Sequence, residues 1–380
     1  MSSMKFLQKN LIVLFFLVLL CAPCAVSAQT IGEIFRAKVV EVVSEKEIQD
    51  EIAGTYVLQE LKAQIQDTAR KGEIVTLSND YTKLSVGDIF FLQYTPEIDG
   101  VAESYTVIER DRRPVLLGFL SLFVLVILVF GKKQGLRSLL SLAGSLFMLA
   151  YVLIPSLLKG VNPMLASTVI ATIILCIAIY FTHGFKREST VALLGTVTAV
   201  IITGIISVIA VKLCYFTGLG SEDAWYLSMN QSVPLNFKGL LLGGIMIGVL
   251  GVLDDIAVTQ VSVVRELYSS APHLTKAQIY KKALRVGQEH VGALVNTLAL
   301  AYTGASLPLL MLISTPSAYP FSVTVSKEVF SVEIIRTIVG SIGLVLTVPI
   351  TTLLAVYMLE HYRGKEYDHD HHGHSHGHVH

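Results

Sequence analysis

Residues 251–260 read Gly-Val-Leu-Asp-Asp-Ile-Ala-Val-Thr-Gln and lie in an apolar stretch that runs from about residue 239 to residue 263. Asp254 and Asp255 therefore stand about ten residues, or roughly 15 Å of helix, before the next cation, Arg265. Carboxylates cannot easily reach water over that length, and ionisable groups inside a membrane span cost several kcal/mol. The stretch therefore predicts a membrane-spanning helix that carries a functional polar site.

The whole chain has the composition of a multipass membrane protein. Of its 380 residues 53% are hydrophobic and only 15% are charged, and the mean hydropathy is +0.63. Soluble domains carry roughly 25% charged residues, so an ordinary soluble enzyme is excluded. Seven apolar stretches come close to the ~20 residues that cross a bilayer, at 115–130, 138–158, 163–183, 189–211, 239–263, 288–313 and 332–359. We expect a mainly α fold, a polytopic transmembrane helix bundle of about seven spans over residues 114–362.

Residues 1–28 have the pattern of a signal peptide. Lys5 and Lys9 precede an apolar run, and the small residues Val26 and Ala28 stand before a cleavage point at Gln29. An uncleaved signal anchor is the alternative. Both place the following segment outside the cytoplasm.

Residues 29–113 form the part of the chain with ordinary soluble composition. They contain five β-like runs separated by turn residues, at 35–43, 55–65, 73–77, 88–94 and 104–109. We expect a small extracytoplasmic β-barrel-like domain of the OB or SH3-like kind. A binding or gating module is our interpretation, with a plain spacer as the alternative.

Most Lys and Arg residues of the loops between spans fall on the side opposite the mature N-terminus. The positive-inside rule then predicts a β domain outside and a cytoplasmic C-terminus, in the plasma (inner) membrane of a bacterium. Membrane lipid is the first expected partner. Zero net charge and the lack of a basic stripe argue against nucleic acid.

A stripe of small and polar residues follows one face of the span that holds the aspartates. At helical spacing it joins Gly244, Gly248, Gly251, Asp255, Thr259 and Ser262. Such a stripe lets another helix approach closely, and packing alone is the simpler explanation of its glycines. We expect Asp255 to face protein or a cavity, and Asp254 to need a neighbouring span or water.

The sixth span carries a second polar stripe. Glu289 and Asn296 are seven residues apart, as are His290 and Thr297, and Gly304 extends that face. Glu289 and His290 also lie near the cytoplasmic interface, where water alone could account for them.

The polar sets of the fifth and sixth spans are expected to meet at one depth. Asn296 lies eleven residues beyond Arg285, as Asp254 lies eleven before Arg265, and the two spans run antiparallel. The expected site contains Asp254, Asp255, His290 and Asn296, with Glu289 at its cytoplasmic mouth. Oxygen ligands and an imidazole suit an inorganic cation or a proton.

Polar residues outside these two spans have explanations that need no functional site. Arg336 follows Glu333 near the outer end of the last span, so it could enter the bundle or pair locally, with snorkelling to the interface as the favoured account. His183 lies at a span end and carries little information. Trp225 marks a short interfacial helix, and Thr275 is the expected N-cap of an amphipathic helix that runs into the sixth span.

Residues 363–380 are expected to form a cytoplasmic His-rich tail. Neutral imidazoles at alternating positions bind divalent transition metals such as Zn²⁺. A metal buffer or sensor, an incidental tail and an added tag remain alternatives. The candidate metal ligands are His369, His371, His372, His374, His376, His378 and His380.

Enzymatic function is less well supported. Adjacent aspartates on one helix diverge, so Asp254 and Asp255 make a poor proteolytic dyad. The chain contains no Walker A, GxSxG or HExxH sequence.

Three motifs carry a resemblance to a known family. They are Asp111-Arg-Arg-Pro, the 251–260 sequence quoted above, and Val295-Asn-Thr-Leu-Ala-Leu-Ala-Tyr-Thr-Gly-Ala-Ser-Leu-Pro-Leu-Leu. Over about residues 30–360 the chain resembles the YibE/F family of bacterial multipass membrane proteins. The resemblance implies a multipass membrane protein and carries over no catalytic residues.

A transport or permease-like protein is the function that these features favour. Asp255 would accept a proton or cation and Asp254 would be its charge partner. The alternative is a membrane scaffold or envelope-biogenesis partner that uses the β domain, and an intramembrane metal-dependent enzyme comes third. A homo-oligomer or another membrane partner is compatible with each of these.

Overall fold

The computed structural model describes residues 33–50, 54–67, 70–97, 103–230, 235–314 and 319–364. The expected signal peptide and His-rich tail lie outside these residues. The described chain divides into two compact units, one that ends at Phe130 and one that begins at Gly131.

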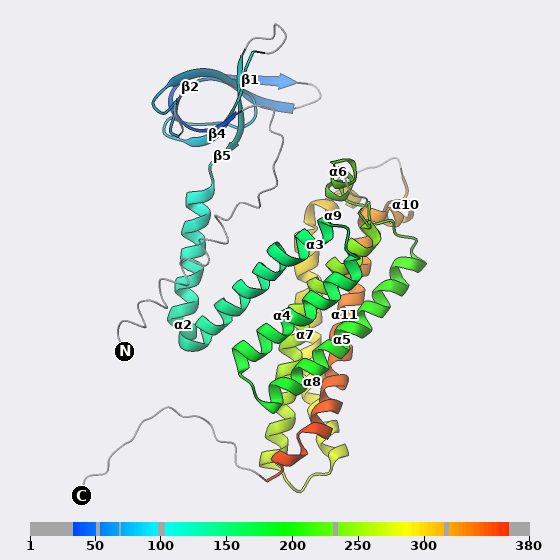
Figure 1. The fold of residues 1–380 in the computed structure, drawn as a ribbon. Coiled ribbons are helices and arrows are strands. Elements are labelled where there is room, and N and C mark those ends of the chain that lie inside the picture. The colour runs from blue at the N-terminus through cyan, green and yellow to red at the C-terminus, as the bar shows by residue number, and fades with distance from the viewer. Residues whose placement is uncertain are drawn as a thin grey trace, which may run out of the picture. The chain divides into compact units, whose positions relative to one another are not determined.

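The first unit contains a five-stranded antiparallel sheet, so the expected small β domain is confirmed. Its strands are β1 (Glu33–Asp50), β2 (Gly54–Ile65), β3 (Ile74–Asn79), β4 (Ile89–Thr95) and β5 (Ser104–Arg110). They lie in the order β3-β2-β1-β4-β5. The sheet curls into a half barrel, which brings the edge strands β3 and β5 into contact (Figure 1).

Alternation along β1 explains the core of this unit. Phe35, Ala37 and Val39 are buried, and the residues between them point outward, as the two-residue period of a strand requires. Two register shifts follow, between Val39 and Glu41 and between Val42 and Ser44. Such bulges increase the local bend of a strand, which lets the long β1 pair with both β2 and β4.

Helix α2 (Arg113–Phe147) contains a break at Lys132, where φ is 48° and ψ is −128°. It continues through η1 (Met148–Leu153) and α3 (Ile154–Leu158). The expected stretches 115–130 and 138–158 therefore fall on either side of this break.

The second unit contains a bundle in which five long helices run side by side (Figure 1). They are α4 (Pro163–His183), α5 (Arg187–Leu213), α7 (Phe237–Ser270), α8 (Lys276–Ala305) and α11 (Glu328–Met358). The short helices α6 (Glu222–Asn230), α9 (Leu307–Ser314) and α10 (Phe321–Ser326) lie at one end, and η2 (Glu360–Tyr362) follows α11.

Helix α7 is the centre of the bundle, because it contacts α4, α5, α8 and α11. Its Leu253 is fully buried in a core that includes Leu175 of α4 and Leu344 of α11. Close packing of α5 on α11 uses glycine: a Cβ on Gly195 would lie 2.5 Å from Thr351 Oγ1.

Five helices of the described chain are long and apolar enough to cross a membrane, and six are if the bent pair α8 and α9 counts as one span. The 46-residue helical segment 113–158 counts once in this tally although it holds two of the seven expected stretches. The number of spans therefore stays a prediction. Two local predictions are confirmed: Trp225 lies in the short helix α6, and Thr275 caps α8 in a capping box with Gln278.

Candidate functional site

A large cavity forms at the end of the bundle where the sixth apolar stretch breaks. Helix α8 ends at Ala305 and α9 begins at Leu307 at an angle of 73° to it. The cavity holds about 700 Å³ and lies among α6, α7, α9, α11 and the loop at residue 218. We call it the Glu333 cavity. Its polar lining includes Ser221, Glu222, Asp223, Ser306, Glu328, Glu333 and Arg336.

The Glu333 cavity contains an ion pair between Arg336 and Glu333, the local pairing considered beside snorkelling. Arg336 Nη1 lies 2.7 Å from Glu333 Oε1, with side chains 27% and 25% exposed. Ser306, at the helix break, donates a hydrogen bond of 3.2 Å to Glu333 Oε2. The pair forms because the two residues are one helical turn apart on the face of α11 that lines the cavity.

Glu328 shapes another wall of the Glu333 cavity. Its carboxylate accepts hydrogen bonds from the backbone N–H groups of Thr217 and Gly218, at 2.9 and 2.7 Å. Gly218 has φ +82°, and a Cβ there would overlap the carbonyl of Phe237. Glycine at this position therefore lets the loop after α5 close over the start of α7.

Asp254 and Asp255 lie near the midpoint of α7, as the sequence indicates. Asp254 is half-buried and Asp255 is exposed on the open side of the helix. The charge of Asp255 acts electrostatically on the imidazole of His183, at the end of α4. Sequence reasoning set His183 aside, because only the packing of α4 on α7 places that imidazole beside Val258 and Ser262.

His183 also lines a small pocket near the C-terminal end of α7, the His183 pocket. It holds about 150 Å³ and includes Ser262. Arg265 Nη1 lies 2.7 Å from Glu188 Oε1 in its wall, and these side chains are only 20% and 14% exposed. The ion pair joins the start of α5 to the end of α7.

The stripe of Gly244, Gly248, Gly251, Asp255, Thr259 and Ser262, here called the α7 stripe, has one end in each cavity. Gly244 lines the Glu333 cavity and Ser262 lines the His183 pocket. Eighteen residues separate them, which is about 27 Å of helix and close to the thickness of the hydrocarbon core. Asp255 lies between them on the same exposed face.

The polar residues of α8 do not join this arrangement within one chain. Glu289, His290, Asn296 and Thr297 are all exposed. Among the described residues no hydrogen bond or ion pair links them to Asp254 or Asp255, and no group of three or more His, Cys, Asp or Glu could hold a metal. The rotation of α8 about its own axis explains this exposure. The side of α8 that packs on the bundle carries Ile279, Ala283, Gly287 and Leu298, and the polar residues lie on the other side.

The glycines predicted for helix packing differ in their surroundings. Gly248 faces the hydroxyl of Tyr302 in α8, so it serves contact between α7 and α8. Gly244, Gly251 and Gly304 have no described atom within 4 Å of an added Cβ. Their small size therefore serves no contact within the described chain.

Gln260 is a buried polar residue that sequence reasoning did not single out, although it ends the 251–260 motif. It is 1% exposed, and its Nε2 donates to the carbonyl of Ala283 at 3.3 Å and to Thr352 Oγ1 at 2.8 Å. Gln260 thus ties α7 to α8 and α11.

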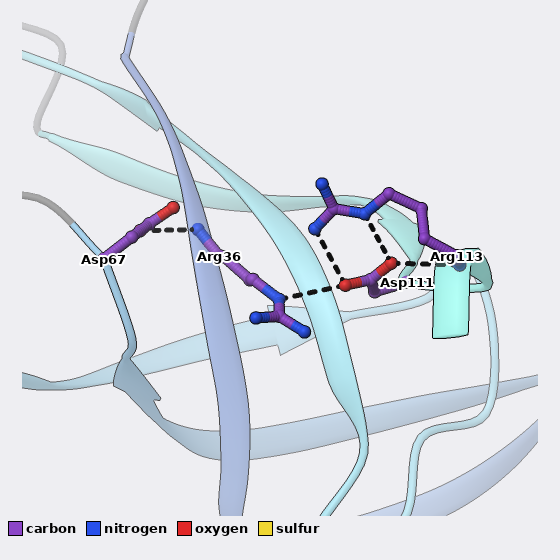
Figure 2. Close-up of polar contacts among 4 residues, drawn as sticks. All are labelled: Arg36, Asp67, Asp111 and Arg113. Atoms are coloured by element: carbon purple, nitrogen blue, oxygen red, sulfur yellow. Dashed lines mark hydrogen bonds and ion pairs between the residues drawn. The ribbon is translucent and has the colours of Figure 1, made fainter. Parts of the chain in front are cut away.

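The first unit has a charged cluster of its own at the Asp111-Arg-Arg-Pro motif. The carboxylate of Asp111 is fully buried, and it accepts from Arg36 Nε at 2.9 Å and from Arg113 Nε and Nη2 at 2.8 and 2.9 Å (Figure 2). These bonds, first those from Arg113, lower the pKa of Asp111 to about 2. Asp67 completes the cluster by accepting from the backbone N–H of Arg36. Since Arg113 begins α2, Asp111 ties that helix to strand β1.

Comparison with known proteins identifies the membrane unit. No curated protein and no solved structure matches the chain. The family model described as YibE/F-like protein matches residues 119–361, so the β domain and the Asp111 motif precede the matched region. That region contains both cavities and the whole of α7, and it is well over half of the chain. The protein therefore belongs to the YibE/F family.

Proposed function

We propose that this membrane protein is permease-like and moves protons or small inorganic cations along the α7 stripe. The Glu333 cavity is one entrance and the His183 pocket is the other. Charged side chains line both, so both suit hydrated ions better than apolar solutes.

The observation that carries the proposal is the position of Asp255. It lies on the exposed face of a central, apolar helix, between two residues of the same stripe that line cavities at its opposite ends. A carboxylate at such a depth is unfavourable unless it binds a cation or proton or contacts water.

Each polar group has a role in this proposal. Asp255 binds the cation or proton, Asp254 is the adjacent charge, and His183 accepts or returns a proton toward the Lys186 end of its pocket. At one entrance the ion pair between Glu188 and Arg265 joins α5 to α7, and at the other the hydrogen bond between Ser306 and Glu333 joins the α8–α9 break to α11. His290 and Asn296 have no part in the path within one copy.

The proposed orientation follows from the loop charges. With the β domain outside a bacterial inner membrane and the C-terminus in the cytoplasm, the Glu333 cavity opens outward and the His183 pocket opens inward. The His-rich tail would then meet cytoplasmic divalent metal as an accessory to transport.

A scaffold is the second candidate, and the Asp111 cluster favours it. That cluster fixes β1 to the start of α2, as a domain that transmits a binding event would need. A scaffold has no use for a conducting stripe, so flux separates the two functions.

The test is uptake of protons, Zn²⁺, Mn²⁺ and Mg²⁺ into proteoliposomes. The intact chain, a tail deletion that ends at Glu366, and Asp255→Asn are compared, with Asp80→Asn in the β domain as the matched control. We expect flux in all except Asp255→Asn. Absence of flux for every cation, with folding verified, would reject transport in favour of the scaffold.

A further inference from the structure

Helix α8 presents an exposed polar seam on the side turned away from the bundle. Its members recur at intervals of three, four and seven residues, the spacing of a helix that packs on another helix. They are Arg285, Glu289, Gly292, Asn296 and Thr303, and all of them are exposed. We call this set the α8 seam.

Lipid tails cannot satisfy the hydrogen-bonding groups of the α8 seam. Asn296 lies eleven residues, or about 16 Å of helix, beyond Arg285. Hydrocarbon tails offer no hydrogen-bond partner to the side-chain amide of Asn296. The apolar Leu298, in contrast, lies on the packed side of α8 and is only 6% exposed. The more polar side of α8 therefore needs a protein surface against it.

Glycine in the seam points to a helix that approaches closely. An added Cβ at Gly292 would have no described atom within 4 Å, as at Gly251 of the adjoining α7 stripe. At Gly287, on the packed side of α8, an added Cβ would instead meet Gln260 and Val348. Packing within the described part of the second unit explains Gly287 but not Gly292.

We propose that a second copy of this chain covers the α8 seam, and that its bulk closes the open side of the α7 stripe. Around a twofold axis along the membrane normal the two α8 helices run parallel, so Asn296 of one copy meets Asn296 of the other. An amide is both donor and acceptor, and identical residues can therefore satisfy each other. Arg285 and Glu289 are also one turn apart, so the guanidinium of one copy can reach diagonally to the Glu289 carboxylate of the other.

The inference concerns the surface beside the proposed path, but it does not depend on transport. A dimer that shows no flux would reject the proposed function and leave the pairing intact. Flux from a chain that stays monomeric would reject the pairing and leave the proposed function intact.

The first experiment counts copies by single-molecule photobleaching in liposomes at decreasing protein-to-lipid ratios. We expect two-step bleaching for the intact chain and its loss in Gly292→Leu, since the new side chain fits the monomer but blocks the seam. Gly118→Leu is the matched control, because Gly118 is another open helical glycine, and it should keep two steps. Single steps for the intact chain at every ratio, or two steps in Gly292→Leu, would overturn the proposal.

The second experiment does not rely on a disruptive variant. In a chain whose four cysteines are replaced by serine, Asn296→Cys should form a disulfide-linked dimer on mild oxidation. Ile201→Cys, an exposed position on α5, should not. Equal cross-linking at both positions, or cross-linking of Asn296→Cys to an unlike protein in native membranes, would contradict a second copy at the seam.

Discussion

Ser306 donates a hydrogen bond of 3.2 Å to Glu333, so the break between α8 and α9 is tied to α11. The same carboxylate holds Arg336 at 2.7 Å. One acid therefore supports both a bent helix pair and a partly buried guanidinium, and its removal should affect the whole end of the bundle.

Glu333→Gln should destabilise the protein by about 2 kcal/mol, the usual loss when a charged hydrogen-bond partner is removed. The amide keeps an acceptor for Ser306 but leaves Arg336 without its counter-charge. Unfolding in detergent, followed by tryptophan fluorescence, checks this. Glu222→Gln changes an exposed acid of the same cavity and should have little effect, so equal losses would contradict the role given to Glu333.

Asp111→Asn should weaken the β unit by about 2 kcal/mol near pH 7, as estimated from the pKa of about 2 against an ordinary value of 3.8. Because the folded pKa is lowered, the carboxylate stabilises the fold above about pH 4, and this contribution disappears as the pH falls toward 2. Limited proteolysis of the β unit in the full chain, measured against pH, gives the profile.

The Asn variant should accordingly lack that acid-dependent step. Asp80→Asn replaces an exposed carboxylate of the same unit and should retain it. If wild type and Asp111→Asn respond to acid identically, the Asp111 cluster does not hold the strand and helix together.

Gly195→Ala should lower stability by about 1 to 3 kcal/mol, because the added methyl overpacks the contact with Thr351 between α5 and α11. An added methyl at Gly118 would have no described atom of its own unit within 4 Å, so Gly118→Ala should be neutral or slightly stabilising, since alanine favours helix. Thermal unfolding of both variants in one detergent provides the comparison. A neutral Gly195→Ala would show that the two helices are not packed this closely.

Periodicity predicted the elements well where a single helix or strand determines the pattern. The β-like run at 35–43 lies within β1, Thr275 marked the start of α8, and Asp254 and Asp255 lie at the middle of α7 as expected. Each of these features depends on residues that lie close together along the chain, so the sequence alone contains the information.

Sequence reasoning was weaker where the rotation of one helix against another decides the result. His183 shares a pocket with Ser262 only because α4 packs on α7, and Asn296 is exposed because α8 packs through Leu298. For Arg336 the sequence favoured snorkelling over a local pair with Glu333, one turn earlier, and the structure contains that pair. Depth along a helix can be counted from sequence, but the direction that a side chain faces is set by the bundle.

The most direct test of the central claim, that the α7 stripe is an aqueous path, is the reaction of single cysteines with a membrane-impermeant thiol reagent. Gly251→Cys and Thr259→Cys on the stripe are compared with Ile201→Cys on α5, in a chain whose native cysteines are replaced by serine. The account predicts that both stripe positions react readily and that Ile201→Cys does not. Stripe cysteines as unreactive as Ile201→Cys, in folded protein, would contradict it.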